Sequence, residues 1–275
     1  MLWLLALVLG AGGVAKAAAP TEAEVTAWNA QGSAAHDRRS LDEASEHYRR
    51  VLDADRWRDP TPEERERVLA LAPRLFLVAG EFFPLKDIVA VVHPDRPIIG
   101  YHLFWEDDLD FPADNEPADH EIVWIEYQPG THTVTRVQTY LHGYVAEGPE
   151  AVADANRQGG RAWIGVEWGK HGSLPRGAAE DAAGARRVLE HNWKALHTTG
   201  RRLPDHPLAR GWPLKFEGDL AAYTAFSVAF DPRPLLEGRG LIRVSRWPNA
   251  TLQQTCLRYN FAPKTEWPWL APIRR

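Results

Sequence analysis

The chain has 275 residues, which is enough for one large domain or two small domains with a substantial core. Its formal net charge is −5, so it lacks the broad basic surface of a nucleic-acid-binding protein, and we expect no nucleic-acid partner. Cys256 is the single cysteine, which excludes an intrachain disulfide.

The first nineteen residues, 1–19, have the pattern of a secretory signal. An apolar run extends from Leu2 to Val14, and Ala15-Lys16-Ala17 fits a small-x-small cleavage pattern. The basic segment that usually precedes such a run is missing, and the run is short for a membrane span, so an uncleaved N-terminal anchor is the alternative. The sequence therefore predicts a secreted or periplasmic protein, with membrane contact only through an uncleaved leader.

Residues 20–83 are predicted to form a helical region. Within it, 27–55 resembles one tetratricopeptide unit, and a second helix is expected over 62–72, with Thr61 as its N-cap. No second copy of the repeat follows, so we expect a helical hairpin that packs on the main domain, with partner docking as a secondary role. The positions that match the repeat are Trp28, Gly32, Ala44, Tyr48 and Leu52.

Residues 84–275 are predicted to form a β-sandwich domain. Short segments rich in β-branched and aromatic residues alternate with turn residues, and the segment 251–261 around Cys256 also reads as a strand. A helix is expected at about 178–198, with Leu189 and Trp193 on its apolar face. The fold class is therefore mainly β with attached helices (α+β): an antiparallel β-sandwich preceded by a helical hairpin.

Two familiar motifs fail on residues that they require. A phosphate-binding loop ending at Lys170 needs glycine at position 164 and Ser or Thr after the lysine, where this chain has Ile164 and His171. A zinc-protease motif starting at His120 needs a second histidine at position 124, where this chain has Trp124. The glycines at 10–13 belong to the leader. We therefore expect no nucleotide or flavin cofactor.

Histidines and carboxylates at predicted strand ends and turns are the candidate site. Such residues suit a divalent ion, with Mg²⁺, Ca²⁺ or Mn²⁺ favoured by oxygen ligands and Zn²⁺ or Fe²⁺ by imidazoles. The candidate general bases are His171 and Glu121. The candidate metal ligands are Asp119, His120 and His142. The candidate binding residues are His102, Asp107, Lys170 and Ser173.

The acidic run 106–121 and the strand that follows it constrain this site. We expect the run to be a structured loop that carries one or two metal-facing carboxylates. Strand alternation places His120 and Glu121 on opposite faces, so both can ligate one ion only if the strand begins after them or contains a bulge.

Part of the chain resembles a known family. Asp119-His120-Glu121, then His142-Gly143, then the strand that closes in Gly169-Lys170-His171-Gly172-Ser173-Leu174-Pro175 are similar to the vacuolar-protein-sorting-type domain family related to necrosis- and ethylene-inducing-like proteins. The resemblance covers residues 98–175 and departs from the family at Lys170, where serine is usual. It implies a β-sandwich with a divalent-metal site at one end, with Asp119, His120, Glu121 and His171 as ligands.

Two functions from different classes fit these observations. The first is an exported β-sandwich protein with a metal or polar site that performs metal-assisted hydrolysis. The second is a non-catalytic binding module for a glycan, a small molecule or a protein. It rests on the twelve tryptophans, which offer stacking surfaces, and on the helical hairpin.

Overall fold

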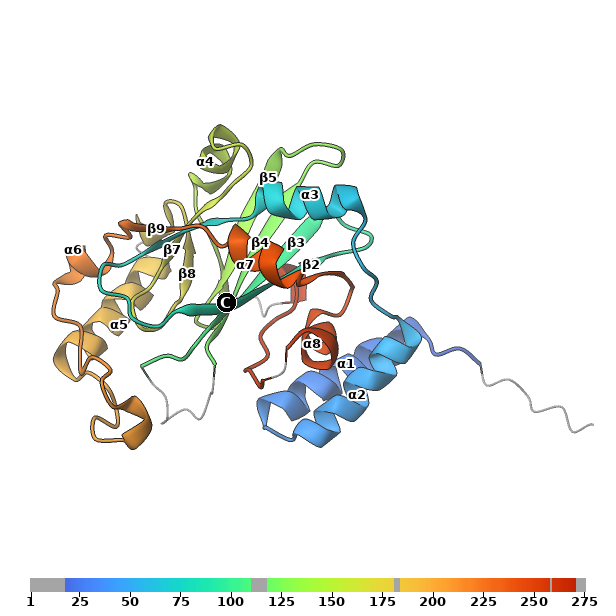
Figure 1. Ribbon diagram of the computed structural model, residues 1–275, viewed down its shortest axis with the longest axis horizontal. Helices are drawn as coiled ribbons and strands as arrows, with labels where there is room; N and C mark the ends of the chain where they lie inside the picture. Colours follow the sequence, from blue (N-terminus) through green and yellow to red (C-terminus); the bar gives the residue numbers. More distant parts are fainter. Residues whose placement is uncertain (1–17, 110–117, 181–183, 258, 271–275) are drawn as a thin grey trace, which may run out of the picture.

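The computed structural model describes residues 18–109, 118–180, 184–257 and 259–270. In these ranges, ten strands form two sheets, and eight α-helices surround them (Figure 1). Most of the leader predicted at 1–19 and the centre of the acidic run, 110–117, lie outside the described residues. None of the described helices combines the length and the apolar character needed to cross a bilayer.

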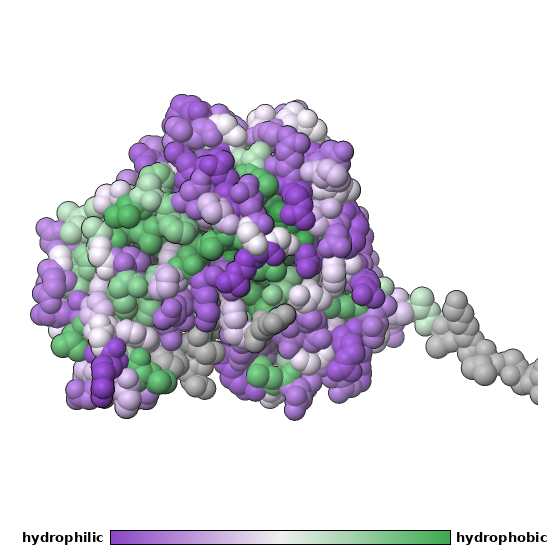
Figure 2. All heavy atoms as spheres, viewed as in Figure 1, coloured by the Kyte–Doolittle hydropathy of each residue, from purple (hydrophilic) through white to green (hydrophobic). Residues whose placement is uncertain are grey.

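The predicted α+β class and the N-terminal helical hairpin are confirmed. Helices α1 (Glu22–Asp37) and α2 (Leu41–Ala54) pack against each other, and α3 (Pro62–Leu71) follows. Thr21 and Thr61 each form a capping box with a glutamate three residues later, which satisfies the first amides of α1 and α3. The surface of the hairpin seen in Figure 2 is mostly hydrophilic.

The hairpin interface has no room for a side chain at Gly32. A Cβ atom there would lie 2.7 Å from the ring of Tyr48, which is fully buried. We expect Gly32→Ala to lower the free energy of unfolding by about 1–3 kcal/mol, because overpacking outweighs the better helix propensity of alanine. Urea denaturation measures this. Gly238→Ala in α7 (Arg233–Arg239) is the control, since a Cβ atom at Gly238 would have no neighbour within 4 Å, and it is expected to cost nothing.

The larger sheet has six strands and carries the candidate site at one end. Its central strands are rich in β-branched and aromatic residues, which favours extended structure. The outermost pair, β10 and β2, is parallel, and the other pairs are antiparallel. In spatial order the strands are β10 (Ile242–Val244), β2 (Leu85–Val92), β3 (Ile98–Trp105), β4 (His120–Tyr127), β5 (Val134–Leu141) and β6 (Tyr144–Glu147).

The smaller sheet has four strands and is also mixed. Strands β1 and β7 are parallel, so the two sheets are not purely antiparallel as the sequence led us to expect. Strand β1 also lies inside the range predicted to be helical, so that region ends at α3. In spatial order the strands are β8 (Ser173–Pro175), β7 (Trp163–Val166), β1 (Arg74–Leu77) and β9 (Val228–Phe230).

Both faces of the six-stranded sheet are covered. One face shares a buried apolar cluster with the four-stranded sheet and with α3, α4 (Ala151–Arg157) and α7. The other face packs against Leu252, Phe261 and Trp267 of the C-terminal segment, which follows α8 (Pro248–Thr251). The helix predicted at about 178–198 is confirmed as α5 (Ala185–Thr198), and α6 (Leu220–Tyr223) lies near it. Short 3₁₀ turns occur at Ala178–Glu180, Pro207–Ala209 and Pro268–Leu270.

The prediction of a strand over 251–261 is wrong. Helix α8 passes directly into a π-helical turn over Leu252–Cys256. Pro248 occupies the first turn of α8, a position that proline tolerates, and Ala250 packs into the core of the hairpin. Packing against the hairpin thus overrides the strand propensity of this segment. Burial raises the pKa of Cys256, which fits a packing role for the thiol better than a nucleophilic one.

Candidate functional site

The turn between β7 and β8, residues 167–172, brings most of the candidate residues together. The backbone amide of Glu167 donates to the carbonyl of Gly172, and the amide of His171 donates to the carbonyl of Glu167. Gly169 and His171 have positive φ angles of 65° and 51°. Such angles cost little at glycine but are uncommon at other residues, so the turn holds His171 in a constrained position.

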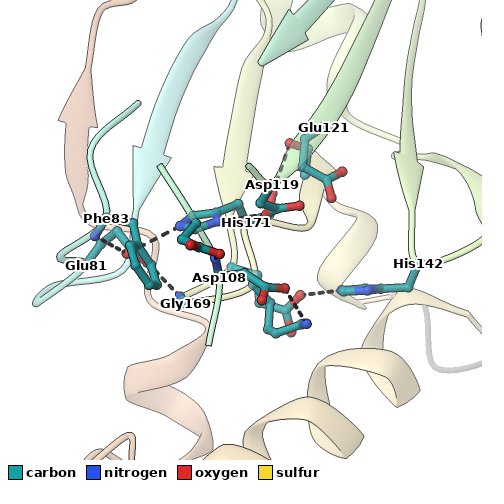
Figure 3. Close-up of polar contacts among 12 residues, drawn as sticks. Glu81, Phe83, Asp108, Asp119, Glu121, His142, Gly169 and His171 are labelled. Atoms are coloured by element: carbon teal, nitrogen blue, oxygen red, sulfur yellow. Dashed lines mark hydrogen bonds and ion pairs between the residues drawn. The ribbon is translucent and has the colours of Figure 1, made fainter. Parts of the chain in front are cut away.

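His171 lies between two carboxylates (Figure 3) and stacks on an indole ring. Its Nδ1 donates to Asp119 Oδ2 at 2.8 Å, and its Nε2 lies 3.4 Å from Glu81 Oε1. The imidazole stacks on Trp105 with 4.3 Å between ring centroids, and none of its side chain is exposed. A cation between two anions explains how these charges are tolerated in the interior.

The two carboxylates favour the protonated form of His171 at neutral pH. Burial would lower the pKa of His171, but Glu81 and Asp119 outweigh burial and raise it to about 10. Burial would likewise raise the pKa of Asp119, but the hydrogen bond from His171 and the charge of Lys264 lower it to about 2. A protonated imidazole has no lone pair to accept a proton, so this geometry favours a structural role for His171 over a general base.

His142 lies in the two-residue turn between β5 and β6. His142 and Gly143 have φ angles of 42° and 95°, and Leu141 pairs with Tyr144 around them. Positive φ at both positions is typical of the type I′ hairpin turn, in which Asn-Gly is the usual sequence. The turn therefore presents the imidazole at the end of the sheet, where 26% of its side chain is exposed.

Glu167 orients His142. His142 Nε2 donates to Glu167 Oε2 at 2.6 Å, and the other carboxylate oxygen accepts from the Tyr223 hydroxyl at 2.7 Å and the Asn192 amide at 2.9 Å. The Glu167 side chain is fully buried. A Cβ atom at Gly172 would lie 2.6 Å from Glu167 Oε2 and 2.7 Å from His142 Nε2, so this close approach requires glycine.

The pair also sets the proton affinity of His142. Burial would lower the pKa of His142, but the Glu167 carboxylate outweighs burial and raises it above the usual value. Burial would raise the pKa of Glu167, but His142 and the two other donors lower it. Nε2 contacts Glu167 Oε2 at 2.6 Å and also lies 3.1 Å from Asn192 Nδ2, and the shorter contact to the carboxylate favours a proton on Nε2. Nδ1 has no hydrogen-bond partner among the described residues and is then the nitrogen that accepts a proton.

Glu121 forms a second buried pair, with Lys264. Lys264 Nζ lies 2.5 Å from Glu121 Oε1, whereas Glu121 Oε2 has no hydrogen-bond partner among the described residues. The β4–β5 pairing ends at Val123 and Thr139, so Glu121 lies where these strands separate. Burial raises the pKa of Glu121 to about 7 despite the opposing charges of Lys264 and His142. Glu121 therefore changes its protonation state near neutral pH.

His120 and His102 lie on the opposite face of the six-stranded sheet from Glu121. His120 Nδ1 donates to the carbonyl of Ala262 at 3.0 Å, which leaves its Nε2 to accept from His102 Nδ1 at 3.1 Å. Burial lowers the pKa of His102 to about 3 and that of His120 well below its usual value. Both are neutral histidines that pack beneath the C-terminal residues.

The remaining predicted residues lie near the β7–β8 turn. Lys170 Nζ forms an ion pair with Asp108 Oδ2 at 2.6 Å, and Asp107 lies next to it in the chain and accepts from the Asp108 amide. Ser173 is buried, and its carbonyl accepts from the hydroxyl of Thr139.

The three predicted metal ligands do not converge on one point. Asp119 is bonded to His171, His120 faces the opposite side of β4, and His142 is bonded to Glu167. Within the described ranges, no group of three or more His, Cys, Asp or Glu side chains is arranged to hold a metal ion.

Sequence reasoning missed the partners that give these residues their properties. Glu167 had one local signal, a carboxylate at the end of an otherwise apolar strand, which requires a polar partner when buried. The other missed residues come from distant segments and have no such signal. They are Glu81, Asn192, Tyr223 and Lys264.

Comparison with protein-family models, curated proteins and solved structures yields no match for this chain. The family resemblance over residues 98–175 and the tetratricopeptide resemblance over 27–55 therefore stay predictions. Any activity assigned to the protein therefore rests on the residues of this chain and their geometry.

Proposed function

We propose that the protein is an exported hydrolase in which His142 acts as a general base. The observation that carries the proposal is the 2.6 Å bond from His142 Nε2 to the buried Glu167 carboxylate, which leaves Nδ1 available. A base whose second nitrogen is held by an orienting carboxylate is the arrangement that activates a nucleophile in many hydrolases. Export is part of the proposal and rests on the predicted leader.

In the proposed reaction, Nδ1 of His142 takes a proton from water, and the resulting hydroxide attacks the electrophilic atom of the substrate. Protonated Glu121 donates its own proton to the leaving group, since its pKa of about 7 allows it to carry one near neutral pH. His142 then loses its proton to water and Glu121 regains one from water, which restores the starting state. Two titratable groups with environments that shift their pKa values, at one end of a sheet, are typical of acid–base sites. Lys264 and Glu167 are positioning residues for Glu121 and His142.

The test compares the wild-type protein with His142→Asn on chromogenic esters, phosphate esters and glycosides. Asparagine removes the base but suits the type I′ turn before Gly143, so the variant keeps its fold. We expect the wild type to hydrolyse at least one substrate class and the variant to be slower by about 10²–10⁴-fold. Hydrolysis by the variant at the wild-type rate would refute the assignment of His142.

Metal-assisted hydrolysis is the second candidate, favoured by the same His142–Glu167 bond. Metal-bound imidazoles commonly donate their other nitrogen to a carboxylate, which orients the ring. In that case His142 Nδ1 would hold the ion, and the ion would supply the activated water. Assays with EDTA, and then with added Zn²⁺, Mn²⁺, Mg²⁺ or Ca²⁺, separate the two candidates: loss and restoration of activity identify metal assistance, and unchanged activity identifies the general base.

A further inference from the structure

A cleft of about 780 Å³ lies between α1 and the C-terminal residues 263–270. This volume is in the range of pockets that hold small ligands. Its lining combines planar polar side chains with aromatic rings, among them Asn29, Glu266 and Trp269. Neither the residues predicted from the sequence nor the His142–Glu167 pair lines the cleft, and only Lys264 among its described lining residues contacts the site described above, through Glu121. The cleft is therefore a second candidate for binding.

Two of the basic side chains that line the cleft are already paired with carboxylates of the protein. Arg246 forms ion pairs with Asp55 at 2.9 Å and Asp95 at 2.7 Å, and Lys264 is paired with Glu121. A strongly anionic ligand would have to compete with these carboxylates for the same cations. The balance of charge therefore favours an uncharged ligand.

Two buried amide oxygens in the cleft lining lack a donor. Asn29 Nδ2 donates to Glu266 Oε2 at 2.9 Å, and Asn249 Nδ2 donates to the carbonyl of Lys264 at 3.0 Å. The side-chain oxygen of each asparagine is buried without a hydrogen-bond partner among the described residues. Unsatisfied buried acceptors are costly, and a ligand rich in hydroxyl donors would satisfy them.

Stacked aromatic rings form one wall of the cleft. The indoles of Trp267 and Trp269 stack with 5.6 Å between centroids and an interplanar angle of 4°, and the guanidinium of Arg96 lies 4.0 Å from the centre of the Trp269 ring. Trp269 is 40% exposed, so part of this apolar surface is open to a ligand. Rings that combine an apolar body with a polar edge suit the mixed surface of a sugar.

We propose that this cleft binds a neutral oligosaccharide. The hydroxyl groups of the sugar donate to the Asn29 and Asn249 side-chain oxygens, and its apolar ring surface packs on Trp269. This inference goes beyond the proposed hydrolysis and does not depend on it, because neither His142 nor Glu121, the two groups assigned to the proton transfers, lines the cleft.

Isothermal titration calorimetry of the full chain tests the proposal with four neutral sugars, N-acetylchitohexaose, cellohexaose, maltohexaose and xylohexaose, and with the anionic hexagalacturonate for comparison. We expect saturable binding of at least one neutral sugar, weakened at least tenfold by Trp269→Ala. The matched control is Trp57→Ala, which also removes a tryptophan beneath an arginine, at 4.8 Å from Arg243, but outside the cleft. The control is expected to bind like the wild type.

Three results would overturn the proposal: no binding of any neutral hexasaccharide, equal weakening by both tryptophan variants, or binding of hexagalacturonate alone. His142→Asn is expected to retain wild-type affinity. Retained affinity together with absent hydrolysis in all proteins would count against the proposed reaction while leaving the cleft proposal intact.

Discussion

Replacing His171 by alanine is expected to lower the free energy of unfolding by about 3–5 kcal/mol, since it leaves two buried carboxylates without their cation. Asp119 and Glu81 both face the imidazole, which is itself fully buried. The loss of the stacked ring over Trp105 adds a cavity to the electrostatic penalty. Urea denaturation followed by circular dichroism measures the change.

The control for this prediction is His132→Ala, which removes an exposed histidine and is expected to change stability by less than about 0.5 kcal/mol. The pH dependence provides a second check. The folded-state pKa of His171, about 10, exceeds its usual value of 6.5, so its contribution is complete below pH 6.5 and is lost as pH rises through 10. A stability difference between wild type and variant that is equal at pH 5 and pH 10 would contradict the ion-pair interpretation.

Glu167→Gln is expected to reduce hydrolysis by about 10²–10⁴-fold, because an amide no longer holds His142 in the orientation and tautomer that leave Nδ1 free. The carboxylate raises the pKa of His142, so its removal lowers that pKa. The limb of the rate profile that reports deprotonation of the base therefore moves to lower pH in the variant. Initial rates measured across pH on the substrate class identified with the wild type check both effects.

The matched control is Glu147→Gln, which makes the same chemical change at an exposed glutamate on β6. It is expected to leave the rate and its pH profile unchanged. Two results would show that Glu167 does not act through His142. One is a Glu167→Gln variant with a normal rate. The other is a variant whose rate is reduced but whose pH–rate profile has its deprotonation limb at the same pH as the wild type.

Local sequence patterns were enough to predict the helical hairpin and the central strands of the large sheet. Thr61 indicates the start of α3 as its N-cap, and the alternation of side-chain direction along a strand places His120 and Glu121 of β4 on opposite faces. The parallel pairings of β1 with β7 and of β10 with β2 join segments far apart in the chain. Nothing in the composition of a strand identifies such a partner, so the mixed sheets could not be predicted.

The segment 251–261 shows how tertiary packing overrides a local preference. Its β-branched and aromatic residues favour a strand, but Ala250 packs into the hairpin core and Gln253 donates to the hydroxyl of Ser45 on α2. The proline at 248, which suits the first turn of a helix, was the available sign of helical structure.

The candidate site was only partly predictable, because its chemistry depends on partners rather than on residue types. His142 and His171 are both histidines in turns after a strand, yet one is paired with a single carboxylate and partly exposed, while the other lies buried between two. Glu81 comes from the loop before β2 and Tyr223 from α6, so their proximity follows from the fold alone. The sequence therefore identifies a histidine as a candidate site residue, but it does not show whether that histidine is a general base or a buried structural cation.

The central claim is that Glu167 holds His142 as a proton acceptor with Nδ1 free. Nitrogen NMR titration of the histidine-labelled protein tests it without knowledge of the substrate. We predict that neutral His142 carries its proton on Nε2, that its pKa lies above 6.5, and that this pKa falls in Glu167→Gln. A neutral His142 protonated on Nδ1, or a pKa that Glu167→Gln leaves unchanged, would contradict this claim.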